Sequence, residues 1–327
     1  MSSIDLLRAP LFVSWELTRG CNLACVHCCA CSAPGGTVPG ELARDAAVRL
    51  AEDIAAGGVP YLMLCGGEPL TVPWFFEIAG ILGEGGVELK IESNGQLLGP
   101  DEARRLAKLP IRSVQISIDG DTQRTYSRQR PGASLEKAHA ACRAVREAGL
   151  PLEVTFAPTR LNVHEAEAVM DRAAALGAFR FNTGALMRLG RAAKLWKDIA
   201  PTSGQYAAFR AGLERKKKEI GPDLELRWSP FTIEEGLEEC LLQPPATLLV
   251  LPDGRVKVAA VLPYTCADLR RQSLAEAWDA YRRAWARPEV REACARVLAD
   301  PARLAEADRW LPLRSGKERG LVLAAGT

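Results

Sequence analysis

Between residues 11 and about 190 the sequence alternates short apolar runs, rich in β-branched residues, with longer amphipathic stretches. This alternation is typical of repeated βα units and a parallel sheet, and therefore of an α/β fold. The pattern contains six such units, fewer than a closed (β/α)8 barrel requires, and so predicts a partial (β/α)6 barrel. The predicted strands are Phe12–Leu17, Tyr61–Cys65, Val87–Glu92, Ser113–Ile118, Leu152–Phe156 and Phe179–Thr183. The predicted helices are Gly40–Ala56, Trp74–Gly83, Asp101–Lys108, Ser134–Ala148 and Val163–Leu176.

The pattern changes after Gly190. Residues 200–219 have the composition of a charged helix, and "ATLLVLPDGRVKV" places Asp253 and Gly254 between two alternating runs, which predicts a β-hairpin. Helices are expected at Ser273–Ala286 and Pro288–Ala299. We therefore expect a partial barrel at 1–195, a connecting helix at 196–225, a small α+β domain at 226–315 and a loose tail at 316–327.

Charge and hydrophobicity narrow the class of protein. Forty-two basic residues face forty acidic ones, so the net charge gives no reason to expect a nucleic-acid or membrane partner. No run approaches the roughly 18 apolar residues of a membrane span, and the N-terminus lacks the pattern of a signal peptide. We expect a cytoplasmic protein, where clustered cysteines indicate metal or redox chemistry rather than disulfides.

The most concentrated chemistry is the stretch "CNLACVHCCACSAPGG", directly after the first predicted strand. Its first three cysteines are spaced C-x3-C-x2-C on a loop at the carboxyl end of that strand, where βα barrels build their active sites. Three thiolates on one loop suit a [4Fe–4S] cluster whose fourth iron is open to a substrate or cofactor. Structural zinc and a reactive thiol fit the spacing less well but are not excluded. The remaining cysteines of this half are expected to be spectators or core residues: Cys29, Cys31, Cys65 and Cys142.

"CNLACVHC" resembles the signature of the radical S-adenosylmethionine (SAM) superfamily. The likeness extends in the family's order to "LCGGEPL" at 64–70, "IESNGQLL" at 91–98, "VQISIDGDTQRTYSRQRPGASLEKA" at 114–138 and "MRLGRA" at 187–192. It is closest to the branch with a C-terminal SPASM or shorter twitch domain, and implies such a domain, in degenerate form, after the partial barrel. It also implies that Cys21, Cys25 and Cys28 hold a [4Fe–4S] cluster at which SAM is reductively cleaved to a 5′-deoxyadenosyl radical.

The same resemblance implies which residues bind SAM. The glycines of "GGEP" would let the backbone approach closely, and its glutamate would accept a hydrogen bond from the methionine amino group. Residues at the ends of the third and fourth strands would line the site, with Asp119 facing the substrate. Positions 155, 162 and 187–189 either approach the ribose and adenine or are structural. The SAM-binding set is Gly66, Gly67, Glu68, Pro69, Ser93, Asn94, Ser117, Asp119, Arg128 (with Arg130 as the neighbouring possibility), Thr155, Asn162, Met187 and Leu189.

Only three cysteines, Cys240, Cys266 and Cys294, lie beyond residue 190. Cys240 stands where the family's first auxiliary ligand falls, ahead of the predicted hairpin. The cysteine expected directly after that hairpin is replaced by alanine, at 259 or 260. The three cysteines therefore either hold one auxiliary iron–sulfur cluster with an open or non-cysteine fourth position, or the region is a remnant that holds none.

The resemblance implies a radical SAM enzyme of oxidoreductase or lyase type. The leading expectation is dehydrogenation, decarboxylation or epimerisation of a sugar-like small metabolite or natural-product intermediate, with a flavodoxin or ferredoxin as electron donor. The first strand begins by residue 12, so a peptide substrate would need a separate recognition partner or direct binding. The alternatives are a maturase of a peptide or tetrapyrrole-derived cofactor and, outside enzymes, an iron–sulfur carrier or sensor.

Overall fold

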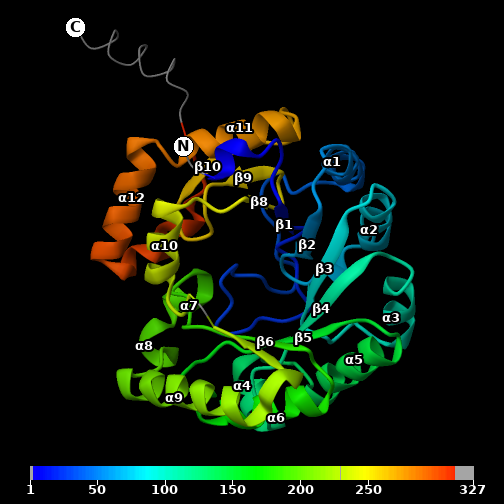
Figure 1. Cartoon of the computed structure of the whole chain (residues 1–327), viewed down its shortest axis with the longest axis vertical. Helices are drawn as coiled ribbons and strands as arrows, with labels where there is room; N and C mark the ends of the chain where they lie inside the picture. The colour runs from blue at the N-terminus through cyan, green and yellow to red at the C-terminus, as the bar shows by residue number, and fades with distance from the viewer. Residues whose placement is uncertain (1–2, 229, 314–327) are drawn as a thin grey trace, which may run out of the picture.

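The computed structural model describes residues 3–228 and 230–313, whose strands form one curved sheet around a central space (Figure 1). The strand order is β11-β10-β9-β8-β1-β2-β3-β4-β5-β6-β7. From β8 through β1 to β7, each strand pairs in parallel with its neighbour. These parallel strands are β1 (Phe12–Glu16), β2 (Tyr61–Cys65), β3 (Glu88–Ser93), β4 (Ile111–Ser117), β5 (Leu152–Thr155), β6 (Arg180–Asn182), β7 (Glu225–Arg227) and β8 (Thr247–Val250).

Helices cover the outer face of the barrel, as the alternating pattern predicted, except for the short α7, whose Arg191 bonds to backbone carbonyls of residues 25–32 (Figure 1). They are α1 (Arg44–Ala56), α2 (Phe75–Glu84), α3 (Pro100–Leu106), α4 (Gln123–Gln129), α5 (Leu135–Glu147), α6 (Ala166–Ala175), α7 (Gly190–Lys194), α8 (Trp196–Ile199) and α9 (Ser203–Ile220). The partial barrel and its first six strands are confirmed. The short helices α4, α7 and α8 were not predicted, because a helix of one or two turns shows little periodicity in the sequence.

The strands divide their side chains between two environments. In β4, Val114 and Ile116 are fully buried, and α5 packs against this strand. Gln115 lies between them in sequence and points the other way, where it bonds to Lys90 and Glu92 of the neighbouring strand. Because side chains alternate along a strand, the inside of the barrel is lined largely by polar groups.

The C-terminal region extends this sheet. β8 and β9 (Arg255–Lys257) form the predicted antiparallel hairpin, with Gly254 at φ +82° in its turn. On its other side β8 pairs in parallel with β1, which joins the region directly to the barrel. The remaining elements are β10 (Tyr264–Asp268), β11 (Leu311–Pro312), α10 (Ile233–Leu242), α11 (Leu274–Ala284), α12 (Pro288–Ala299), and the 3-10 helices η1 (Ser3–Leu6), η2 (Pro69–Thr71), η3 (Val163–Glu165), η4 (Gly221–Asp223) and η5 (Pro301–Arg309).

The N-terminal segment packs against this C-terminal region. Trp278 and Tyr281 of α11 stack in the core with ring centroids 5.4 Å apart, and the Trp278 indole N–H donates to the Leu7 carbonyl at 3.0 Å. The boundaries proposed at 195, 225 and 315 stay a prediction, and the predicted tail at 316–327 lies outside the described residues. Within 3–228 and 230–313, none of the helices has the length and apolar character that crossing a membrane requires.

Candidate active site

The cysteine loop runs from the end of β1 to α1. Its first residues are bound by the turn that follows β2. The N–H groups of Gly67 and Glu68 donate to the carbonyls of Thr18 and Gly20 at 2.7 and 3.0 Å. A Cβ at Gly67 would lie 1.9 Å from the Gly20 carbonyl oxygen, and Gly66 has φ +130°. Both positions therefore require glycine. The glycines expected at the SAM site thus also fix the loop that carries the cysteines.

A second contact to this loop comes from Arg191, at the start of α7. Its guanidinium donates to the carbonyls of Cys25 (2.6 Å), Ser32 (2.9 Å) and Cys31 (3.3 Å). Its backbone N–H donates to the Cys28 carbonyl at 2.9 Å. Sequence reasoning missed this residue. The available signal was a cation directly after the glycine of "MRLGRA", a motif in which the resemblance implies a role only for residues 187–189.

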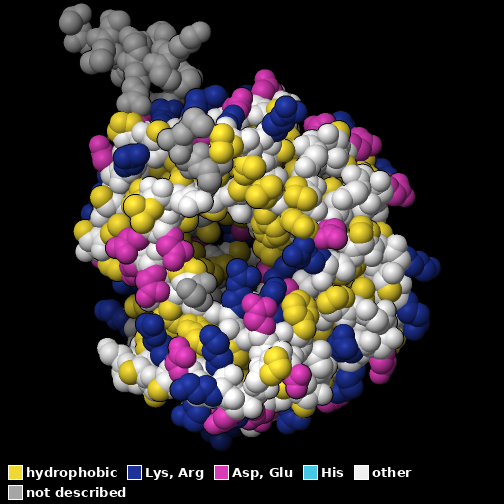
Figure 2. Space-filling model, in the orientation of Figure 1, with side chains coloured by type: hydrophobic (Ala, Val, Ile, Leu, Met, Phe, Trp, Pro, Cys, Tyr) yellow, Lys and Arg dark blue, Asp and Glu magenta, His cyan; other side chains and the backbone are white. Residues whose placement is uncertain are grey.

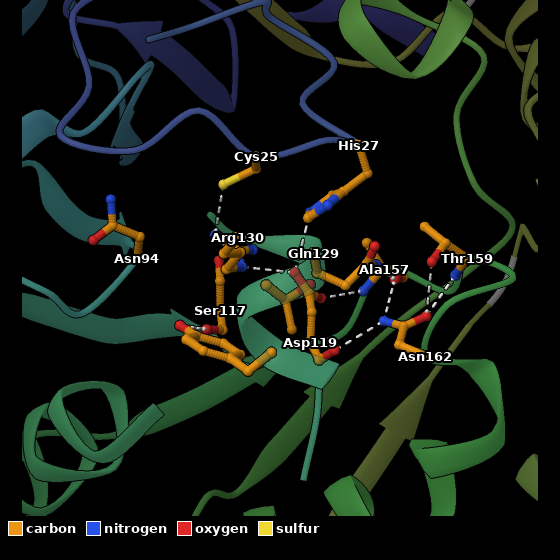
Figure 3. Close-up of polar contacts among 12 residues, drawn as sticks. Cys25, His27, Asn94, Ser117, Asp119, Gln129, Arg130, Ala157, Thr159 and Asn162 are labelled. Carbon is orange, nitrogen blue, oxygen red and sulfur yellow. Dashed lines mark hydrogen bonds and ion pairs between the residues drawn. The ribbon is translucent and has the colours of Figure 1, made fainter. Parts of the chain in front are cut away.

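Beneath the loop, Asp119 contacts the side chains of Arg130 and His27 (Figure 3). Its Oδ2 accepts from Arg130 Nε at 2.7 Å and lies 3.1 Å from His27 Nε2, while Oδ1 accepts from the Ala157 N–H at 2.8 Å. Burial alone would raise the pKa of Asp119, but Arg130 and His27 outweigh it and hold that pKa well below its usual range. Arg130 Nη1 also lies 3.6 Å from Cys25 Sγ.

This geometry corrects one prediction and limits another. Arg128 is exposed on α4 and does not line the cavity, whereas Arg130, at the C-cap of that helix, is buried beside Cys25. The chain turns at Arg130 and brings its side chain back over the barrel. Asp119, expected to face the substrate, is fully buried and already bound by its partners. It therefore positions Arg130 and His27 instead.

Glu68 is also fully buried, and it links the turn after β2 to the end of β3. Its carboxylate accepts from Ser93 Oγ at 2.9 Å, the Asn94 N–H at 2.8 Å and the Leu70 N–H at 3.3 Å. Burial raises its pKa to about 7 despite these bonds. The side-chain amide of Asn94, fixed in this way, lies 3.8 Å from Cys21 Sγ. Glu68 thus places Asn94 beside the cysteines.

A cavity of about 920 Å³ gathers these parts into one site. Figure 2 shows the molecule hollowed at its centre, between the C-terminal elements and the barrel. The predicted residues that line the cavity are Cys21, Cys25, Cys28, Gly66, Gly67, Ser93, Asn94, Ser117, Thr155, Met187 and Cys240. Those outside its lining are Glu68, Pro69, Asp119, Arg128, Asn162, Leu189, Cys266 and Cys294. Asn162 instead donates to the carbonyls of Asp119 and Ala157, both at 3.0 Å, as Figure 3 shows.

The C-terminal region supplies the far wall of the cavity, which is mainly apolar. It comes from one face of α10, the end of β8, the loop after β9, and α11: Phe231, Ile233, Leu237, Leu249, Val258, Val261 and Tyr281. Sequence reasoning gave Cys240 a place in the family's pattern but did not identify α10, the helix that carries it. Of the three C-terminal cysteines, only Cys240 lines the cavity; Cys294 is fully buried and Cys266 Sγ lies 3.6 Å from the Val256 carbonyl. The auxiliary cluster stays a prediction.

The donor groups of the loop fit an iron–sulfur cluster. Burial first, and then the charges of Glu68, Cys25 and Cys28, raise the pKa of Cys21 to about 11, and a bound metal ion would favour its thiolate form. The Leu23 N–H donates to Cys21 Sγ at 3.4 Å, and Arg130 approaches Cys25 Sγ. Such donors stabilise charge on cluster-ligating sulfur.

A parallel partial barrel with three cysteines on its first loop, facing an internal cavity, is the arrangement expected of a barrel enzyme that binds an iron–sulfur cluster. A family profile described as the radical SAM superfamily matches residues 15–173. The AdoMet-dependent heme synthase of Methanosarcina barkeri is 30% identical over 299 residues, which cover 84% of each chain. The chain belongs to the radical SAM superfamily, whose cofactors are a [4Fe–4S] cluster and SAM.

This chain matches the relatives below over a smaller share of their length than it matches the heme synthase. The mycofactocin maturase MftC of Mycobacterium ulcerans is 34% identical over 221 residues, covering 65% of this chain and 58% of that protein. Among solved structures, Streptococcus suis SuiB bound to its precursor peptide SuiA has a TM-score of 0.67 at 13% identity, covering 84% of this chain and 66% of SuiB. AdoMet-bound anSMEcpe has a TM-score of 0.63 at 15% identity, covering 87% of this chain and 82% of that one. The structural likenesses show the shared fold.

Proposed function

We propose that this chain is a radical SAM maturase that modifies a precursor peptide. The observation that carries the proposal is the single cavity that joins the cysteine loop to an apolar wall and lies open at the molecular surface (Figure 2). The relatives support the proposal: MftC is named a maturase, SkfB of Bacillus subtilis is named a maturation protein, and SuiB was solved with a bound precursor peptide. The sequence-based expectation of a sugar-like small metabolite has no such support.

The size of the cavity favours a substrate that enters only in part. Ligand sites commonly measure about 300–1,000 Å³, and here about 920 Å³ must also receive SAM. What remains suits one side chain or a chain end, with the rest of the substrate outside. An extended peptide can place one part in the cavity and leave the rest outside, whereas a large rigid macrocycle cannot.

The bound cofactors would supply the hydrogen-abstracting radical chemistry of the family. The residues of this chain would then bind and orient. Cys21, Cys25 and Cys28 would hold the cluster. Asn94 lies beside the Cys21 sulfur, Arg130 lies beside the Cys25 sulfur, and Asp119 fixes Arg130. The apolar wall from the C-terminal region keeps water away from the reacting centre.

A second candidate function, on a tetrapyrrole, is favoured by one observation: the chain covers 84% of the heme synthase, against 58% of MftC. The lining of the cavity opposes it. Tetrapyrrole intermediates carry several carboxylates, but among the described residues the one arginine that lines the cavity, Arg130, already pairs with Asp119. We therefore rank the peptide first.

The test is anaerobic reconstitution with iron and sulfide, followed by reduction in the presence of SAM. Peptides encoded beside the gene, and separately an iron-containing tetrapyrrole acid, would be added and analysed by mass spectrometry. We expect 5′-deoxyadenosine together with a mass change in one peptide. The Cys21/Cys25/Cys28 triple alanine variant should yield neither product. Modification of the tetrapyrrole alone would contradict the proposal, and absence of 5′-deoxyadenosine would exclude every radical SAM function.

A further inference from the structure

We propose that the barrel end of the cavity is a binding subsite for a cationic group of the substrate, with the Glu92 carboxylate as its contact. This inference rests on the proposed maturase function and names the substrate class that the site selects, a peptide with a lysine or arginine side chain at or beside the modified residue. Glu92 lies within the stretch "IESNGQLL", directly before Ser93 and Asn94, and the family resemblance assigns no role to it.

Glu92 lines the cavity from the end of β3, with Gln115 opposite on β4. One carboxylate oxygen, Oε1, accepts from Gln115 Nε2 at 2.8 Å. Over residues 3–228 and 230–313, Glu92 has no cation within ion-pair distance and no further hydrogen bond. Its second oxygen is therefore left for a group that enters the cavity. Burial raises the pKa of Glu92, the cost expected when a carboxylate lacks a close counter-charge.

The cations nearest to Glu92 are committed to another carboxylate. Lys90 Nζ lies 2.9 Å from Glu153 Oε2 and also donates to Gln115 at 2.9 Å. Arg180 lies 3.5 Å from the same glutamate and 2.8 Å from Glu225. The Asn182 amide donates to Glu153 as well, at 2.6 Å. Because Glu153 gathers these donors, Glu92 keeps its charge uncompensated at short range.

The rest of the cavity lining has the same bias. Its positively charged or chargeable side chains, Arg130 and His27, both contact Asp119. Glu239 of α10 lines the opposite side and forms no ion pair in the described part of the chain. The site thus offers two unpaired carboxylates and no unpaired lysine or arginine. A cation at Glu92 gains a counter-charge, and a carboxylate-rich ligand is repelled.

The test uses the reconstituted holoenzyme with SAM and three small probes. N-acetyl-lysine amide carries the cation, its ε-acetylated form removes the charge at similar length, and N-acetyl-norleucine amide removes the polar end. Dissociation constants would be measured by ligand-observed NMR. We expect the lysine probe to bind about tenfold more tightly than either neutral probe, as one charge-assisted hydrogen bond in a partly dry site provides.

Two variants assign that preference to a residue. Glu92→Gln keeps the shape and should abolish the preference. Glu88→Gln, on the same strand, removes an exposed carboxylate paired with Arg112 and should leave it intact. Equal binding of the three probes to the wild type overturns the proposal without any variant. If the Glu92→Gln variant still prefers the lysine probe, the proposal is overturned. The proposal is also overturned if Glu92→Gln weakens the binding of SAM but leaves the binding of the lysine probe unchanged.

These outcomes are separable from failure of the proposed function. Probe binding is measured at equilibrium and needs no turnover, so the preference can hold in a protein that modifies no peptide. In that case the cationic subsite stands and the maturase proposal fails. Peptide modification with no preference for the lysine probe gives the reverse result.

Discussion

Arg191 offers the sharpest test of how the cysteine loop is held. The change Arg191→Met removes the guanidinium and keeps an unbranched apolar side chain of similar length. The carbonyls of Cys25, Cys31 and Ser32 would each lose a donor. The backbone bond from residue 191 to the Cys28 carbonyl would remain, so the variant isolates the side chain.

The magnitude follows from these three bonds. A hydrogen bond to a charged group contributes about 1.5–3 kcal/mol, but the 3.3 Å bond to Cys31 is the longest of the three, and Arg191 is only half-buried. Two strong bonds and one weak one give a loss of about 3–4 kcal/mol in the free energy of unfolding. Single domains have about 5–15 kcal/mol in total, so the loss is large and should fall mainly on the loop.

Urea unfolding of the metal-free protein measures the loss in the free energy of unfolding. Iron and sulfide counts after reconstitution measure how well the altered loop still holds a cluster. We expect Arg191→Met to unfold at clearly lower urea and to hold less than half of the wild-type iron. Arg188→Met is the matched control, because in the described part of the chain that guanidinium lies over the Trp196 ring, at 5.3 Å, and forms no ion pair, so the change should cost less than about 1 kcal/mol. If Arg191→Met unfolds like the wild type and binds a full complement of iron, the loop is held by the turn after β2 alone and our reasoning is wrong.

Three further predictions concern the same site. Gly67→Ala should prevent cluster assembly, measured as iron content, because its Cβ meets the Gly20 carbonyl at 1.9 Å, whereas Gly80→Ala, with open space around it, should not. Arg130→Lys should weaken SAM binding, measured by equilibrium dialysis, by tenfold or more, because lysine cannot reproduce the planar contact with Asp119, while Arg128→Lys should bind SAM normally. Burial raises the pKa of Glu68 from 4.5 to about 7, so its protonated form is favoured in the folded state; the associated stability is present below pH 4.5 and is lost as the pH rises to 7. Relative to Glu68→Gln, the wild type should therefore lose about 3 kcal/mol over that interval in urea titrations, and a constant difference would contradict this origin.

The barrel strands were predictable because each is a short buried run, and the strands that escaped prediction lack this feature. β2, for example, places Leu62 and Leu64 in the core. β7 has three residues and β11 has two, too few for a pattern, and their place is set by the neighbouring strand rather than by their own sequence. The parallel pairing of β8 with β1 was not predictable for the same reason: a hairpin pattern says nothing about which edge the hairpin joins.

At the site, sequence reasoning located the loops but not the direction of each side chain. Arg128 and Arg130 are two residues apart at the end of α4, and only the path of the chain after the helix decides which one enters the cavity. Asp119 was expected to face a ligand, yet its partners His27 and Ala157 come from distant loops. Charge pairing of this kind depends on tertiary contacts, which a motif does not record.

The pairing of β8 with β1 fixes the C-terminal wall of the cavity relative to the cysteine loop. Ser14 and Trp15 of β1 lie in register with Leu249 and Val250 of β8, and β1 leads directly into the cysteine loop. The C-terminal wall is thereby fixed relative to the cluster by backbone hydrogen bonds, whatever its side chains are. α10 and the loop after β9 contact the cavity through side chains that take no part in this pairing. Substitutions there can alter the substrate while the distance between the wall and the cysteines stays constant, which is what hydrogen abstraction from a precisely placed substrate requires.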